Sequence, residues 1–118
     1  MLNPSISHVF LPAIASAFLI LLGQSPSGAQ EAVTLRTSIK NHLFQPAELK
    51  APANTPITLI VRNLDPTPEE FESKTLRVEK VVAGNAEITL KLRPLAAGRY
   101  RFYGDFNEST AEGAIIAE

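Results

Sequence analysis

Cysteine is absent from this 118-residue chain, tryptophan is absent too, and the only methionine is the first residue. The lack of thiols excludes disulfide scaffolds, cysteine-ligated zinc, iron–sulfur clusters and cysteine nucleophiles. Neither sign of charge prevails, because the chain has eleven Lys and Arg and twelve Asp and Glu, for a formal net charge of −1. A nucleic-acid-binding domain usually shows a clustered basic excess, so the charge balance argues against a nucleic-acid partner.

Charged residues are also missing from the start of the chain, where the first Asp, Glu, Lys or Arg is Glu31. The stretch from Val9 to Gly23 is apolar, but it is shorter than the roughly 20 residues of a membrane span. A polar, turn-forming stretch follows and ends at Ala29. This layout predicts a secretory signal peptide over residues 1–29 and one mature domain over residues 30–118. The alternative is an uncleaved N-terminal anchor, and both place the domain outside the cytoplasm.

The mature part consists of short segments separated by Pro, Gly and Asn turns. Apolar and polar residues alternate in Val33–Ile39 and Glu87–Leu92, and Ile57–Arg62 is rich in β-branched residues, all patterns of strands. Further extended segments are expected at Ala47–Lys50, Glu69–Ser73, Leu76–Val81, Arg99–Tyr103 and Gly113–Ala117. Seven or eight strands at this spacing predict an all-β fold, a small β-sandwich.

Motifs of common enzymes are missing as well. The chain has no G-x-S-x-G, no phosphate-binding glycine loop and no H-E-x-x-H. A mature sandwich of this size also offers little room for a substrate cleft. The sequence therefore argues against hydrolase and transferase chemistry.

Two acidic clusters remain as candidate sites, and the first is Pro-Glu-Glu-Phe-Glu over residues 68–72. Side chains alternate between the two faces of a strand. We therefore expect Glu70 and Glu72 on one face, and Glu69 and Phe71 on the other.

The second cluster, Gly-Asp-Phe-Asn-Glu over residues 104–108, follows the strand that ends at Tyr103. Like charges held together repel, and a bound cation would relieve that repulsion. The alternative interpretation is that both clusters are solvated acids at strand ends. Phe71 and Phe106, each set between acids, are expected to lie in the core.

The order of the motifs resembles the cupredoxin superfamily. The matching pieces are F-x-P-A-E-L at 44–49, V-R-N at 61–63, P-E-E-F-E at 68–72, G-R-Y-R-F-Y-G at 98–104 and G-A-I-I at 113–116. The resemblance covers essentially the whole mature chain. It implies a cupredoxin-like Greek-key β-sandwich.

Blue-copper cupredoxins hold their metal with a His, then a Cys, a second His and usually a Met. Carried over, the first His falls at Glu69 or Glu70, the Cys at Gly104, the second His at Asn107 and the Met near Ala111. All four ligands are replaced. Because a thiolate, imidazoles and a thioether define that site, the chain is not a blue-copper protein.

Three segments are more specific: E-E-F-E-S at 69–73, L-R-V-E-K at 76–80 and G-D-F-N-E-S-T-A-E-G at 104–113. They resemble the small periplasmic cupredoxin-like proteins of bacterial ferrous-iron transport systems, and the cupredoxin domain of EfeO-type iron-uptake proteins. In that subgroup a His commonly stands where Asn107 stands here. The resemblance implies a periplasmic location, with an inner-membrane iron permease and other periplasmic iron-transport components as partners.

The resemblance also places one histidine, two residues before the Phe of F-x-P, near the metal end of the sandwich. The implied metal ligands are His42, Glu69, Glu70, Glu72, Asp105 and Glu108. Carboxylates with at most one imidazole form a hard site that suits iron, manganese or Cu(II). We expect a copper or iron ion and a metal-binding or ferroxidase-like role in ferrous-iron uptake. The alternative is a non-catalytic interaction module that has lost metal binding, and whether a homodimer completes the site stays open.

Overall fold

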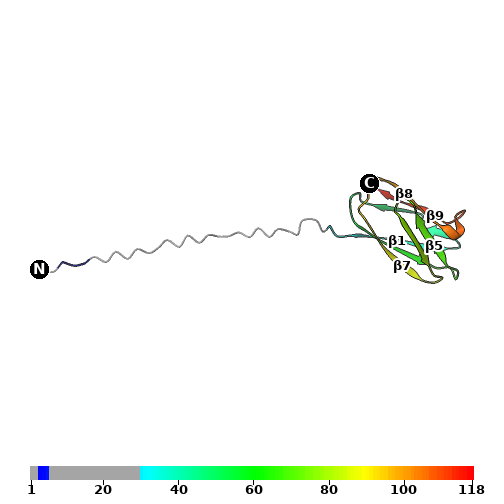
Figure 1. Ribbon diagram of the computed structural model, residues 1–118, viewed down its shortest axis with the longest axis horizontal. Coiled ribbons are helices and arrows are strands. Elements are labelled where there is room, and N and C mark those ends of the chain that lie inside the picture. Colours follow the sequence, from blue (N-terminus) through cyan, green and yellow to red (C-terminus); the bar gives the residue numbers. More distant parts are fainter. Residues whose placement is uncertain (1–2, 6–29) are drawn as a thin grey trace.

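The computed structural model describes residues 3–5 and 30–118, and residues 30–118 form nine strands and one short 3-10 helix (Figure 1). The elements are β1 (Val33–Lys40), β2 (Leu43–Gln45), β3 (Glu48–Ala51), β4 (Ile57–Asn63), β5 (Glu69–Ser73), β6 (Val78–Val82), β7 (Glu87–Leu92), β8 (Gly98–Gly104), η1 (Asp105–Asn107) and β9 (Glu112–Ala117). Apart from residues 3–5, the predicted signal peptide and its cleavage site lie outside the described residues. None of the helices among the described residues is long and apolar enough to cross a membrane.

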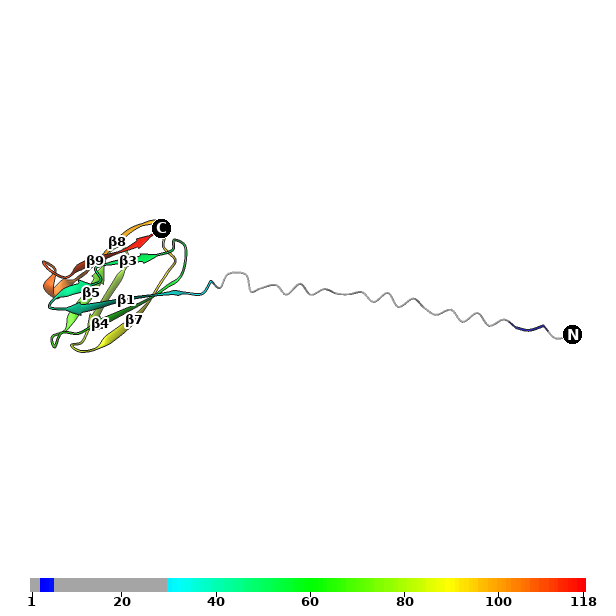
Figure 2. The same cartoon turned by 180° about the vertical axis from the view of Figure 1, so that it is seen from behind.

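The strands form two sheets that face each other, in the orders β2-β1-β4-β7 and β3-β9-β8-β5-β6 (Figures 1 and 2). β1 runs parallel to β4 and β3 parallel to β9, and the other pairs are antiparallel. The all-β sandwich predicted from the sequence is confirmed. It has one strand more than expected across residues 30–118, because β2 and β3 flank Pro46 and join different sheets.

The core lies between the sheets, where the inward side chains of the alternating strands meet. Phe44, Phe71 and Phe102 are almost fully buried, and the Phe44 ring stands edge-on to Phe102 with 4.8 Å between their centroids. The expectation that Phe71 is a core residue is confirmed. The same expectation for Phe106 is wrong, because this residue lies in η1 rather than on a strand and is 51% exposed.

The acidic clusters lie at the end of the sandwich away from the start of β1. At this end β1, β4 and β8 finish and β5 begins, and η1 closes one side of it (Figures 1 and 2). The backbone N–H of Leu64 donates to the carbonyl of Ile39 at 2.8 Å, which ties the loop after β4 to the end of β1. The two acidic clusters, distant in the sequence, lie side by side, because β5 pairs with the end of β8 at Phe71↔Gly104.

Candidate functional site

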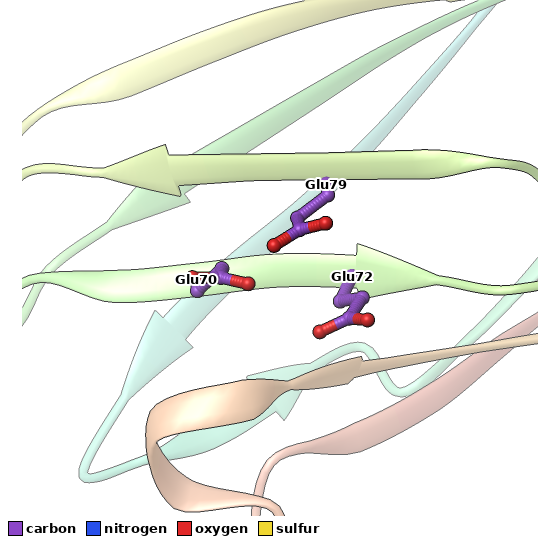
Figure 3. A group of neighbouring side chains, drawn as sticks. All are labelled: Glu70, Glu72 and Glu79. Atoms are coloured by element: carbon purple, nitrogen blue, oxygen red, sulfur yellow. The ribbon is translucent and has the colours of Figure 1, made fainter.

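Three glutamates gather on the outer face of the β5–β6 hairpin (Figure 3). Glu70 and Glu72 are half-buried on β5, and Glu79 is exposed on β6 directly opposite Glu72. One carboxylate oxygen from each lies within 4.8 Å of the others. Within the described part of the chain, no other three His, Cys, Asp or Glu side chains come together in this way. We call these three residues the glutamate cluster.

The repulsion within the glutamate cluster raises the pKa of Glu70. A hydrogen bond with Glu79, desolvation, and the charges of Glu79, Asp105 and Glu72 together raise the pKa of Glu70 to about 7. The hydrogen bond requires that one of the two carboxyl groups carry a proton. A cation bound by the same oxygens would replace that proton and cancel the repulsion.

An open pocket of about 240 Å³ adjoins the cluster at the closed end of the hairpin. Glu72 and Glu79 line it, together with Lys74 and Arg77. The cavity is smaller than the pockets of about 300–1,000 Å³ that hold drug-sized ligands. Its size suits a hydrated ion better than a large organic substrate.

A tyrosine supports the cluster from the neighbouring strand. Tyr103 on β8 pairs with Glu72 and is 5% exposed. Burial, and then the interaction of its hydroxyl with Glu72, raise the pKa of Tyr103, so the phenol remains protonated beside the carboxylate. The guanidinium of Arg101 covers the ring at 4.5 Å from its centroid and is held by Glu112 at 2.8 Å and Glu108 at 3.4 Å.

Glu69 points to the opposite side of β5, into the sandwich, as strand alternation predicts. It is 1% exposed, and its Oε1 accepts the backbone N–H groups of Glu70 at 3.0 Å and Phe106 at 2.9 Å. Its Oε2 accepts the side-chain amide of Asn107 at 2.7 Å. Both oxygens are therefore engaged by the protein itself.

The positions that the resemblance assigns to the ligands of blue-copper proteins lie around this buried carboxylate. A Cβ atom placed on Gly104 would lie 2.5 Å from Cδ of Glu69 and 2.8 Å from Cβ of Ala111. The space that a cysteine side chain would need is thus filled by Glu69. With an amide at Asn107 in addition, the residues present do not fit a blue-copper ion.

His42 lies in the two-residue turn between β1 and β2, where Asn41 and His42 both have positive φ, of 52° and 59°. Their backbone N–H groups donate to the carboxylate of Asp65 at 2.8 and 3.0 Å, and these bonds lower the pKa of Asp65. The Nδ1 atom of His42 lies 3.7 Å from Oδ2 of Asp65. The imidazole therefore faces Asp65 and is not part of the glutamate cluster.

Of the six residues expected as ligands, the structure brings only Glu70 and Glu72 into the glutamate cluster. Asp105 opens η1, which lies beside β5 (Figure 3), and its charge contributes to the raised pKa of Glu70. Glu108 pairs with Arg101 instead.

Glu79 was not among the metal ligands expected from the sequence. The signal was available in the spacing, because four residues, 74–77, separate β5 from β6. A hairpin centred on that turn places Glu72 and Glu79 opposite each other, as the register Ser73↔Val78 and Glu72↔Glu79 shows.

Comparisons with known proteins agree with this fold. The sequence profile of the cupredoxin-like domain family matches residues 13–117. The chain is 44% identical over 82 residues to Uncharacterized protein RP394 of Rickettsia prowazekii (strain Madrid E). That match covers 70% of this chain and 66% of the relative, slightly less than two thirds of its length.

Among solved structures, auracyanin A, a "blue" copper protein from Chloroflexus aurantiacus, superposes with a TM-score of 0.64 at 12% identity and covers 75% of this chain and 100% of that one. The metal-binding domain of the Cu(I)-exporting P-type ATPase CopA from Streptococcus pneumoniae D39 gives 0.61 at 15%, covering 72% and 84%. A purple cupredoxin from Nitrosopumilus maritimus gives 0.54 at 16%, covering 75% and 100%. At these identities the likeness concerns the fold alone.

Proposed function

Because the chain belongs to the cupredoxin-like domain family, we propose that it binds a transition-metal ion, copper or iron, through Glu70, Glu72 and Glu79. One observation carries this proposal, namely three carboxylate oxygens from adjacent strands within 4.8 Å of one another. Like charges directly opposite each other destabilise a sheet, and a bound cation would offset this repulsion. The raised pKa of Glu70 supports the same conclusion.

Oxygen ligands decide which ions suit the glutamate cluster. Carboxylates are hard ligands that favour Cu(II), Mn(II) and iron over Cu(I). Three negative charges also attract a trivalent ion more strongly than a divalent one, so the cluster stabilises Fe(III) relative to Fe(II). Copper is further supported by the structural neighbours, which include a blue copper protein and the metal-binding domain of a Cu(I) exporter.

We place this metal binding in ferrous-iron uptake, outside the cytoplasm, in the periplasm. The support is the resemblance of residues 69–73, 76–80 and 104–113 to the cupredoxin-like proteins of ferrous-iron transport systems. In this role the chain is a metal-binding or ferroxidase-like component that serves an inner-membrane permease. The apolar, uncharged start of the sequence supports export.

The first experiment is a titration of residues 30–118, which contain the nine described strands and their core, with Cu(II) and separately with anaerobic Fe(II). A ligand that binds only the native state raises the thermal midpoint in proportion to the logarithm of its concentration over Kd. We expect a rise with at least one metal that Glu70→Gln and Glu72→Gln both abolish. The matched control is Glu87→Gln on β7 in the other sheet, which should behave as the unmodified chain. A rise that all variants retain would contradict the proposal.

A second candidate function, a metal-free interaction module, is favoured by the filled position around Glu69. The exposed apolar side chains of Leu43, Leu64 and Phe106, each from a loop or strand end at the η1 end of the sandwich, would then form the contact surface. In that case neither metal changes the thermal midpoint.

A further inference from the structure

We infer that the carboxylate of Glu69 acts as an internal anchor that positions the segment from Gly104 to Ala111 without a metal. This segment includes η1 and begins where β8 ends. The inference concerns the inner face of β5. It does not require that a metal bind at the glutamate cluster on the outer face.

The strand pairing shows why an anchor is needed here. β5 and β8 pair only at Phe71↔Gly104 and Glu72↔Tyr103, so Glu69 lies beyond the last pair. The chain turns away from the sheet at Gly104 and enters η1. The carboxylate bridges this opening, because it accepts the backbone N–H of Phe106 and the side-chain amide of Asn107.

The carboxylate of Glu69 is buried, and N–H donors surround it. Glu69 is 1% exposed, and a buried carboxylate is tolerated only when hydrogen-bond donors surround it. Three N–H groups supply those bonds at 2.7–3.0 Å. The segment is also closed on itself, since Gly104 donates to the carbonyl of Ala111 at 2.9 Å and Ala111 donates to that of Asn107 at 2.8 Å.

The packing around Gly104 supports the anchor independently of the hydrogen bonds. A Cβ atom on Gly104 would lie within 2.8 Å of both the Glu69 carboxyl group and the Ala111 methyl group. Glu69 therefore occupies the room that a ligand side chain from Gly104 would need. Because η1 follows directly, the anchor also fixes Asp105 next to β5, where its charge acts on Glu70. Glu69 is in this sense a positioning residue.

The test exchanges donor and acceptor between two side chains in the metal-free chain with EDTA present. Asn107→Asp sets a carboxylate against that of Glu69 and should lower the thermal midpoint by about 5 °C or more. Glu69→Gln alone should have a smaller effect, because its Oε1 still accepts both backbone N–H groups. In the double variant the new amide of residue 69 donates to the new carboxylate of residue 107, which restores the pattern. We expect its midpoint to lie well above that of Asn107→Asp.

The outcome that overturns the anchor is additivity, with the double variant no more stable than the sum of the single changes predicts. A purely structural loss of packing would give that result, whereas rescue requires the direct bond. Should Asn107→Asp fail to fold, hydrogen exchange of the Phe106 amide in the unmodified chain decides. Slow exchange supports its bond to Glu69, and exchange at the rate of an exposed loop amide overturns it. EDTA removes bound metal from every arm, so failure of the proposed metal binding would leave this test intact.

Discussion

Glu72 on β5 and Glu79 on β6 stand directly opposite each other in the antiparallel register, on the solvent side of the sheet. Cross-strand neighbours of like charge destabilise a hairpin, and here Glu70 adds a third carboxylate within reach. The sequence could have avoided this repulsion with a single lysine at position 79. The glutamate cluster therefore has a stability cost in the metal-free chain that a bound cation would remove.

The first prediction concerns this cost. Glu79→Gln removes a charge from the cluster, so it should raise the thermal midpoint of the metal-free chain at pH 8. The same change should weaken metal binding by about tenfold or more, equivalent to about 1.4 kcal/mol. Calorimetric unfolding with and without metal measures both effects. A lower midpoint without metal would show that Glu79 has a stabilising contact other than the cluster.

The second prediction is a pH dependence. The raised pKa of Glu70, about 7 against an ordinary 4.5, means that the folded chain retains a proton that the unfolded chain releases between pH 4.5 and 7. The contribution of this group to stability is therefore complete below pH 4.5 and is lost as the pH rises to 7. Thermal midpoints across pH 4.5–8 should fall through this window. In Glu70→Gln the fall should be smaller.

Metal binding should show the opposite trend, because protons compete for the same carboxylates. The rise in midpoint at a fixed metal concentration should be larger at pH 7.5 than at pH 5. An equal rise at both pH values would place the ion elsewhere on the chain.

The sequence predicted the sandwich because its strands carry strong local patterns. Glu87–Leu92 was expected as a strand and is β7, and the alternation in residues 69–73 placed Glu69 and Glu70 on the correct faces. The resemblance to cupredoxins agrees with the family profile and the structural neighbours.

The surroundings of the candidate site were harder to predict, because they depend on contacts between segments far apart in the sequence. Phe106 was assigned to the core from its hydrophobicity, although it lies in η1 and is exposed. The contact of His42 with Asp65 arises from a turn in which two consecutive residues have positive φ. Asn at position 41 suits such a turn, but His at position 42 gave no signal for it.

The third prediction tests the support from β8. Tyr103→Phe removes the hydroxyl that interacts with Glu72 but leaves the ring under Arg101. Residues that orient a metal ligand typically change affinity by about 10- to 100-fold. We expect a loss in that range with little change in the midpoint of the metal-free chain. A lower midpoint with unchanged affinity would assign Tyr103 a role in packing alone.

The fourth prediction concerns the turn that carries His42. Asp65→Asn leaves one acceptor oxygen for two backbone N–H groups, those of Asn41 and His42. Asn41 is exposed and His42 is half-buried, so water can reach the released donor, and the loss of one hydrogen bond should destabilise the variant by about 0.5–1.5 kcal/mol. Because the pKa of Asp65 is lowered, its contribution is present above its ordinary value of 3.8 and is lost as the pH falls through the folded-state pKa. Denaturant unfolding should therefore show a larger difference between the two chains at pH 7 than at pH 2.

The last prediction concerns Gly104, whose backbone has φ −92° and ψ 108°, a conformation that alanine adopts without strain. Any effect of Gly104→Ala must therefore come from the space around the new methyl group. That methyl would lie 2.5 Å from Cδ of Glu69, and overpacking of this kind costs about 1–3 kcal/mol. Glu69→Ala removes the nearer obstacle and leaves only Cβ of Ala111 at 2.8 Å. Glu69→Ala should therefore cost less in the Gly104→Ala background than in the unmodified chain. Denaturant unfolding of the four proteins measures this coupling. Independent, additive effects would mean that the carboxylate of Glu69 does not occupy the space beside Gly104 in solution.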